Sequence, residues 1–181
     1  FRLLWSGGVH SFVGEHFVVD HAEIFDLPDA EIPLILGVSG AESLKLAREA
    51  ADGIMTTDPS REIADGFGDG PRYVEVALAI ADSEEEGRKL AHERFRFSAF
   101  DWSVNSEIPS VEGFEGATKF VRREDIADKI PAGPDVEVHL KAIAKAIDAG
   151  FDHIVLTGMG PDQARFIDFY ENELKPRLVG G

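Results

Sequence analysis

The stretch PLILGVSGAESLKLAREAADGIMTT, residues 33–57, decides the fold of this chain. It begins with the apolar run 34–36, which is typical of a buried strand. Apolar residues at helical spacing follow over 41–51, and a second short strand, DGIMTT, is expected over 52–57. Strand, helix and strand in this order predict a βα unit with parallel strands and a right-handed crossover.

The rest of the chain repeats this alternation. The expected strands are 33–38, 52–57, 72–81 and 152–160, and the expected helices are 41–51, one beginning after Asp82 or Ser83, 134–149, and a terminal helix entered through Pro161. Four strands alternating with helices predict either half of a (β/α)8 barrel or a small open α/β sheet. We expect a single domain over 1–181, with an irregular insertion around 99–133 that is rich in Pro, Gly and Ser.

The N-terminal segment has a different character. Residues 12–28 are extended and rich in aromatic side chains, and predict a hairpin or an irregular excursion over the surface. The first five residues, FRLLW, resemble the end of a helix already under way. We therefore expect that the N-terminal part of the parent protein is missing.

Composition excludes several classes of function. The 181 residues include 34 acidic and 18 basic side chains, for a net charge of −16, which argues against nucleic acid and against anionic membrane surfaces as partners. No apolar run has the length of a membrane span, and the N-terminus lacks the layout of a signal peptide. Cysteine is absent, which excludes disulfides and thiolate metal sites and favours a cytoplasmic location. The acidity indicates either an ordinary acidic enzyme or adaptation to high salt (a halophilic protein).

The turn at 37–41, GVSGA, carries almost no side chains. In a parallel sheet this turn lies at the carboxyl end of a strand, where α/β proteins bind their ligands. One interpretation is structural, with Ser39 and Glu42 forming a capping box. The other is functional: Gly37 and Gly40 permit close approach, and the amides of residues 39–41 would hold a phosphate at a helix N-terminus. The two interpretations are compatible.

Two further turns are weaker candidates. LTGMGPDQ, residues 156–163, is either a phosphate-binding loop or an ordinary Gly-rich turn before a helix. TTDPSR, residues 56–61, offers the hydroxyls of Thr57 and Ser60 to a ligand, or is ordinary turn chemistry. The six histidines show no metal-binding spacing and are interpreted as structural, and no GxSxG elbow supports a nucleophilic hydrolase.

Four stretches together resemble one family. They are LLWSGGVHSFVGEHFVVDHAEIFDLP (3–28), the stretch at 33–57 quoted above, GPDVEVHLKAIAKAIDAGFDHIVL (133–156) and GPDQARFIDFYENELKPRL (160–178). They are similar to the luciferase-like monooxygenase superfamily, and most closely to its coenzyme F420-dependent oxidoreductases, the branch that includes F420-dependent glucose-6-phosphate dehydrogenase. The resemblance implies a (β/α)8 TIM barrel of which this chain is the second half, strands five to eight.

The resemblance also assigns a cofactor site. In this family the turn after strand five lies against the phosphate-bearing tail of F420. On this sequence that turn consists of Gly37, Val38, Ser39, Gly40 and Ala41. A bare turn is what a packed phosphate would require.

The substrate site departs from the family's pattern. The sugar-phosphate dehydrogenases hold the substrate phosphate with a Thr, two Lys and an Arg. The Thr corresponds to Thr57, the first Lys position holds Ser60 beside Arg61, the second Lys falls near Asn105, and the Arg position holds Lys129. Lys129 keeps the charge but loses bidentate geometry. We therefore expect an alcohol, aldehyde or small carbonyl compound in place of glucose 6-phosphate.

The resemblance implies an enzyme that transfers a hydride between F420 and a small-molecule substrate, without a metal and as a homodimer. The family's catalytic residues come from the first four strands, so no catalytic residue is assigned to this chain. One alternative is an FMN-dependent monooxygenase of the same superfamily. Another is a non-catalytic half-barrel that only binds a cofactor or a partner.

Overall fold

The computed structural model describes residues 1–179. Their contacts divide the chain into two compact units, Phe1–Leu34 and Ile35–Gly181. The second unit holds the four strands that the sequence predicts. The single domain over 1–181 stays a prediction.

The first unit contains a hairpin. A short helix, α1 (Arg2–Trp5), precedes the antiparallel strands β1 (His10–Val13) and β2 (Val18–Ala22). The Gly14 amide donates to the Phe17 carbonyl at 2.8 Å and closes the turn between the strands. Of the two structures considered for this segment, the hairpin is confirmed.

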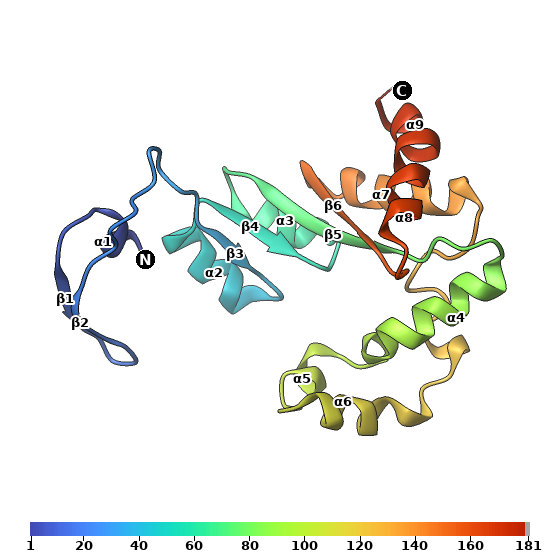
Figure 1. The fold of residues 1–181 in the computed structure, drawn as a ribbon, viewed down its shortest axis with the longest axis horizontal. Coiled ribbons are helices and arrows are strands. Elements are labelled where there is room, and N and C mark those ends of the chain that lie inside the picture. Colours follow the sequence, from blue (N-terminus) through green and yellow to red (C-terminus); the bar gives the residue numbers. More distant parts are fainter. Residues whose placement is uncertain (180–181) are drawn as a thin grey trace. The chain divides into compact units, whose positions relative to one another are not determined.

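The second unit is built on a four-stranded parallel sheet (Figure 1). Its strands are β3 (Ile35–Gly37), β4 (Gly53–Thr56), β5 (Arg72–Leu78) and β6 (His153–Gly158). They lie in the order β3-β4-β5-β6, and each neighbouring pair is parallel. This confirms the α/β class and the four strands. β5 ends earlier than expected because Ala79 leaves the ladder and pairs with Ala132 of the insertion.

Helices follow the strands, and the last of them end the chain's described part. They are α2 (Ala41–Ala50), α3 (Arg61–Phe67), α4 (Glu84–Phe95), α7 (Val136–Asp148), α8 (Gln163–Phe169) and α9 (Lys175–Val179). The predicted terminal helix is interrupted by a π-helical turn, Tyr170–Leu174, between α8 and α9. Within residues 1–179, no helix combines the length and the apolar composition that crossing a membrane requires.

Local capping explains where these helices begin and end. Ser83 accepts a hydrogen bond from the Glu86 amide at 3.2 Å, as expected for the N-cap of α4. Asp135 caps α7 in the same way. Gly150 follows α7 with φ +100°, a conformation that glycine adopts without strain.

The two faces of the sheet differ. Side chains alternate along a strand, so residues in register on neighbouring strands share a face. The packed face carries Ile54, Val74, Val76, Leu78 and Leu156, which form the main core with α2, α3 and α7. In the view of Figure 1, α3 lies behind β4 and β5.

The opposite face, called the open face below, carries Met55, Tyr73, Glu75, Val155 and Thr157. Met55, Tyr73, Glu75 and Thr157 are only partly buried. Val155 is 38% exposed, although a parallel sheet is ordinarily covered on both sides. The helix layer of the second unit therefore buries one side of the sheet far more completely than the other.

The segment between α4 and α7 is the insertion that the sequence predicts as irregular. It consists of short helices: η1 (Arg96–Ala99), α5 (Trp102–Asn105), α6 (Val111–Ala117), η2 (Thr118–Phe120) and η3 (Arg123–Asp125). Its apolar residues Ile126 and Ile130 form a second, smaller core with Ala79, Ala91 and Met159. This core ties the insertion to α4 and to the segments that follow β5 and β6.

Candidate functional site

The candidate site lies at the carboxyl edge of the sheet. Because the four strands are parallel, they end at the same edge, at Gly37, Thr56, Leu78 and Gly158. The loops that follow them contain most of the site residues predicted from the sequence. Ligands of α/β proteins bind at this edge.

The turn after β3 is bare and accessible. Val38 is buried at 5% exposure, while Ser39, Gly40 and Ala41 are exposed. A Cβ built on Gly37 or on Gly40 would meet no other atom within 4 Å. The space beside this turn can therefore accept a phosphate group next to the start of α2.

The hydrogen bonds of this turn differ from the predicted capping box. Ser43, not Ser39, provides the cap: its hydroxyl oxygen accepts from the amides of Ser39 at 3.1 Å and Gly40 at 3.2 Å. The same hydroxyl donates to the Gly40 carbonyl at 3.0 Å. The pairing of Ser39 with Glu42 was wrong because α2 begins one residue later than that box requires. Two of the three amides expected to face a phosphate are therefore already bonded, and a ligand would have to displace Ser43 or use Ala41.

The turn after β4 presents hydroxyls without a free cation. Thr57 is exposed, and Thr56 accepts from the Asp58 amide at 3.1 Å. Ser60 is the N-cap of α3, but its side chain makes no capping hydrogen bond. Arg61, which adjoins the family's first Lys position, donates to the Asp148 carbonyl at the end of α7. It is therefore already engaged away from the turn.

The two positions in the insertion are also engaged. The Lys129 ammonium donates to the Ser98 carbonyl. The Asn105 amide donates to the carbonyls of Phe97 at 3.2 Å and Phe100 at 3.3 Å. Both side chains hold the insertion together in this structure, and their role in substrate binding stays a prediction.

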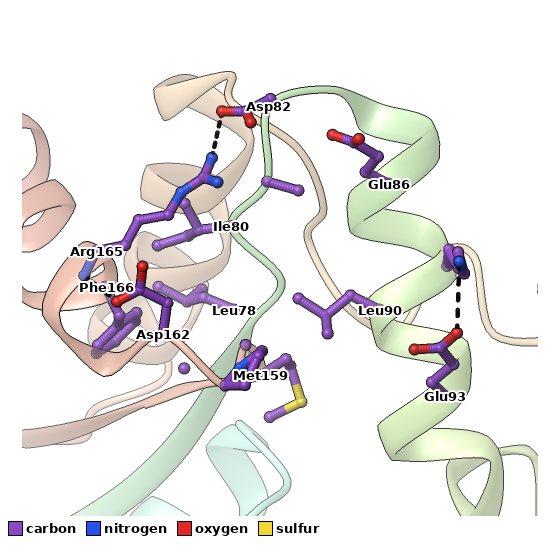
Figure 2. A pocket seen from close by; sticks show the side chains of 15 residues that line it. Leu78, Ile80, Asp82, Glu86, Leu90, Glu93, Met159, Asp162, Arg165 and Phe166 are labelled. Carbon is purple, nitrogen blue, oxygen red and sulfur yellow. Dashed lines mark hydrogen bonds and ion pairs between the residues drawn. The ribbon is translucent and has the colours of Figure 1, made fainter.

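A pocket of about 370 Å³ lies beside the ends of β5 and β6, between α4 and α8 (Figure 2). Its apolar lining comes from Leu78, Ile80, Leu90, Met159 and Phe166. The turn at 156–163 contributes Gly158, Gly160 and Pro161, so this part of the LTGMGPDQ stretch does line a cavity. None of the residues predicted for the cofactor or the substrate lines it.

Charged side chains surround this pocket, and its cations are paired. Arg165 and Asp82 form an ion pair with 2.7 Å between Nη2 and Oδ1, and Lys89 lies 3.9 Å from Glu93. Glu86 adds a further carboxylate. This lining does not suit a phosphate. Asp82 and Arg165 could not be recognised as neighbours from the sequence, since they lie 83 positions apart and no local pattern links them.

One of the six histidines, His139, is part of the buried interior, and the structural role of the others stays a prediction. His139 is fully buried; its Nε2 lies 2.9 Å from the Gly133 carbonyl, and its Nδ1 has no partner in the described part of the chain. Burial lowers the pKa of His139, while the Gly133 hydrogen bond and Asp135 act in the opposite direction. Within residues 1–179, no group of three or more His, Cys, Asp or Glu side chains is arranged to hold a metal ion.

The parallel β/α sheet with a ligand-accessible carboxyl edge is the arrangement of (β/α) barrel enzymes. The model of the luciferase-like monooxygenase family matches residues 1–153, and the chain belongs to this family. This agrees with the resemblance found in the sequence.

Curated relatives extend the comparison. The F420-dependent glucose-6-phosphate dehydrogenase of Mycolicibacterium gilvum (strain PYR-GCK) is 29% identical over 194 residues, which cover 98% of this chain and 57% of the relative. The enzyme of the same name from Nakamurella multipartita is 28% identical over 197 residues, covering 97% of this chain and 56% of the relative. The chain therefore spans little more than half the length of these relatives.

Solved structures share the fold. An F420-dependent secondary alcohol dehydrogenase in complex with an F420-acetone adduct matches 96% of this chain and 58% of its own, with a TM-score of 0.76 and 20% identity. The coenzyme F420-dependent tetrahydromethanopterin reductase from Methanopyrus kandleri matches 96% of this chain and 59% of its own, with a TM-score of 0.69 and 19% identity. A Baeyer-Villiger monooxygenase from Pseudomonas putida in complex with FMN reaches a TM-score of 0.52 at 14% identity, covering 96% of this chain and 59% of its own. Of the two architectures considered from the sequence, the half-barrel is the one these structures support.

Proposed function

We propose that the protein acts as an F420-dependent oxidoreductase that transfers a hydride between the deazaflavin and a small organic alcohol, aldehyde or carbonyl compound. The observation that carries the proposal is the turn at residues 37–41, which has only small side chains on its exposed part and open space beside Gly37 and Gly40. The names of the curated relatives support F420 as the ligand.

The residues present fit the phosphate-bearing tail of F420. Small residues leave room at the start of the ten-residue helix α2, and a helix N-terminus favours an anion. Ser39 would offer its hydroxyl and Ala41 its amide, while Val38 anchors the turn in the core. F420 itself, when bound, supplies the carbon that accepts or donates the hydride.

The surroundings favour a substrate without a phosphate group. Four cations of the pocket, the β4 turn and the family's substrate positions, Arg61, Lys89, Lys129 and Arg165, are each engaged by a carbonyl or a carboxylate. A phosphate dianion bound by any of these four would have to compete with that interaction. Thr57 and Ser60 offer hydroxyls, which suit a neutral polar substrate.

Titration with F420 and, separately, with FMN tests the proposal through the change in cofactor fluorescence. We expect tighter binding of F420, and a Gly40→Leu variant should bind F420 at least about tenfold more weakly, because the new side chain fills the space for the phosphate. Gly40 has φ −179°, so leucine fits its backbone and the fold should be retained.

The matched control is Gly116→Ala, in an exposed part of α6 where a Cβ also meets no other atom within 4 Å. It should leave F420 binding unchanged. Tighter binding of FMN would favour the monooxygenase alternative, and binding of F420 without turnover of any alcohol or carbonyl compound would favour the non-catalytic half-barrel. The homodimer stays a prediction, and light scattering tests it by measuring the mass of the protein in solution.

A further inference from the structure

Glu75 and Thr157 form a hydrogen-bonded pair on the open face of the sheet. The Thr157 hydroxyl donates to Glu75 Oε1 at 2.7 Å, and both residues are partly buried. Glu75 lies on β5 and Thr157 on β6. A carboxylate at the middle of a strand in a parallel sheet is unusual, because such strands are ordinarily apolar on both faces.

Thr157, one member of the pair, lies near the carboxyl edge of the sheet. Thr157 is in register with Ala77, two residues beyond Glu75, and it immediately precedes Gly158, where β6 ends. Ala77 packs against the second core, which the insertion builds at this edge. The Thr157 hydroxyl therefore lies on the open face, close to the end of β6.

The hydrogen bond fixes the orientation of the Thr157 hydroxyl group. The Thr157 hydroxyl has a single proton and donates it to Glu75 Oε1, so this proton is committed to Glu75. The lone pairs of the hydroxyl oxygen are then available to a donor. Within residues 1–179, no donor to this oxygen is found.

We infer that Thr157, oriented by Glu75, is a specificity-determining residue that accepts a hydrogen bond from the hydroxyl group of an alcohol substrate. This inference rests on the proposed function and narrows its substrate class. An alcohol O–H can donate to Thr157, whereas a ketone or an aldehyde has no proton to donate there. Glu75 acts as a positioning residue, since it sets the direction of the Thr157 hydroxyl without touching the substrate.

The test compares the binding of cyclohexanol and cyclohexanone to the F420-loaded protein. Saturation-transfer NMR gives the two dissociation constants. Steady-state kinetics gives KM and kcat for oxidation of the alcohol and for reduction of the ketone. Thr157→Val removes the hydroxyl at nearly constant shape and should weaken cyclohexanol about three- to tenfold while leaving cyclohexanone unchanged. Thr157→Ser should restore the affinity for cyclohexanol.

Glu75→Gln provides a readout that a merely structural role would not give. The carboxamide of glutamine can donate to Thr157, which frees the Thr157 proton to point towards the substrate. The preference should then shift, with cyclohexanone binding more tightly and cyclohexanol more weakly than in the unmodified protein. Glu49→Gln, an exposed change on α2, is the matched control and should change neither ligand.

The affinity for F420, measured in parallel, distinguishes a failure of the Thr157 inference from a failure of the proposed function. Unchanged F420 binding together with an unchanged alcohol-to-ketone ratio in Thr157→Val would overturn the inference and leave the proposed function standing. An equal loss for both ligands would also overturn it, because the pair would then serve the fold alone. A failure of the unmodified protein to bind F420 would overturn the proposed function, and the inference with it.

Discussion

Gly87 of α4 lies directly against Gly133 at the end of the insertion: a Cβ on Gly87 would be 2.4 Å from the Gly133 nitrogen and 2.8 Å from the Ala79 carbonyl oxygen. The Gly133 amide also donates to that carbonyl at 2.9 Å. The two glycines therefore let α4, the extension of β5 and the returning insertion meet at backbone distance. The insertion is held at the carboxyl edge by this contact.

Gly87→Ala should consequently destabilise the protein by about 1–3 kcal/mol, because backbone atoms must move apart to admit the methyl group. Gly116→Ala, also within a helix but with free space around it, should stabilise by up to about 1 kcal/mol through helix propensity. Urea unfolding of both variants measures the difference. An increase in stability for Gly87→Ala would show that α4 and the insertion do not touch.

The unequal burial of the two faces of the sheet leads to a second prediction, about the stability of variants on each face. Ile54 is fully buried in the main core, whereas its neighbour Met55 is only partly buried on the open face. Ile54→Ala should lower the free energy of unfolding by about 2–5 kcal/mol. Met55→Ala should cost about 1 kcal/mol, because less apolar surface leaves contact. Equal losses in urea unfolding would mean that the open face is covered as fully as the packed face.

Substrate charge leads to a third prediction. The family's first Lys position holds Ser60, whose side chain makes no capping hydrogen bond. Ser60→Lys should place a free cation at the carboxyl edge and tighten the binding of glucose 6-phosphate about fivefold, or about 1 kcal/mol. Ala50→Lys adds the same charge at the far end of α2 and should have no effect. Isothermal titration calorimetry measures both, and equal gains would mean that only net charge matters.

Much of the architecture could be predicted from the sequence because its causes are local. Strand β5 and helix α7 follow from apolar periodicity, and the start of α4 follows from Ser83 followed by an acidic turn. The cap of α2 could not be resolved in this way. Ser39 and Ser43 are both plausible partners for the same amides, and only the backbone of the turn decides between them.

The remainder of the site depends on contacts that no local pattern encodes. Arg61 bonds to a carbonyl 87 residues away, and Lys129 to one 31 residues away. The Glu75–Thr157 pair joins residues 82 apart, through the register of two strands. Such partners follow from the tertiary fold, so the sequence could propose cations for a substrate but not show that they are already engaged.

The burial of His139 predicts a pH dependence of stability. Its ring packs edge-on against Phe169, with the centroids 5.5 Å apart, and Nδ1 has no partner among the described residues. Burial lowers the pKa of His139 in the folded state, with the Gly133 carbonyl and Asp135 opposing the shift. On acidification, the unfolded chain therefore takes up this proton first.

The sign follows from this order of protonation. Stability from His139 is complete above its unfolded pKa of about 6.5 and falls as the pH drops below that value, by at most about 1.4 kcal/mol per pH unit for one proton. The free energy of unfolding in urea is measured from about pH 7.5 to about pH 5. Its slope against pH should be shallower in His139→Gln than in the unmodified protein. His16→Gln, at an exposed position, is the control, and an equal reduction of the slope there would contradict the assignment to His139.

The net charge of −16 predicts a dependence on salt that separates the two interpretations of the acidic composition. Self-repulsion of the carboxylates opposes the compact state, and screening shortens its range to about 3 Å at 1 M salt. A protein adapted to high salt should gain several degrees in melting temperature between dilute buffer and molar KCl. Chloride is the appropriate anion, because sulfate also strengthens apolar burial. The gain should shrink near pH 4, about the pKa of the carboxylates, since their protonation removes the repulsion that salt screens. A melting temperature that is equal in dilute buffer and in molar KCl at neutral pH would identify an ordinary acidic protein.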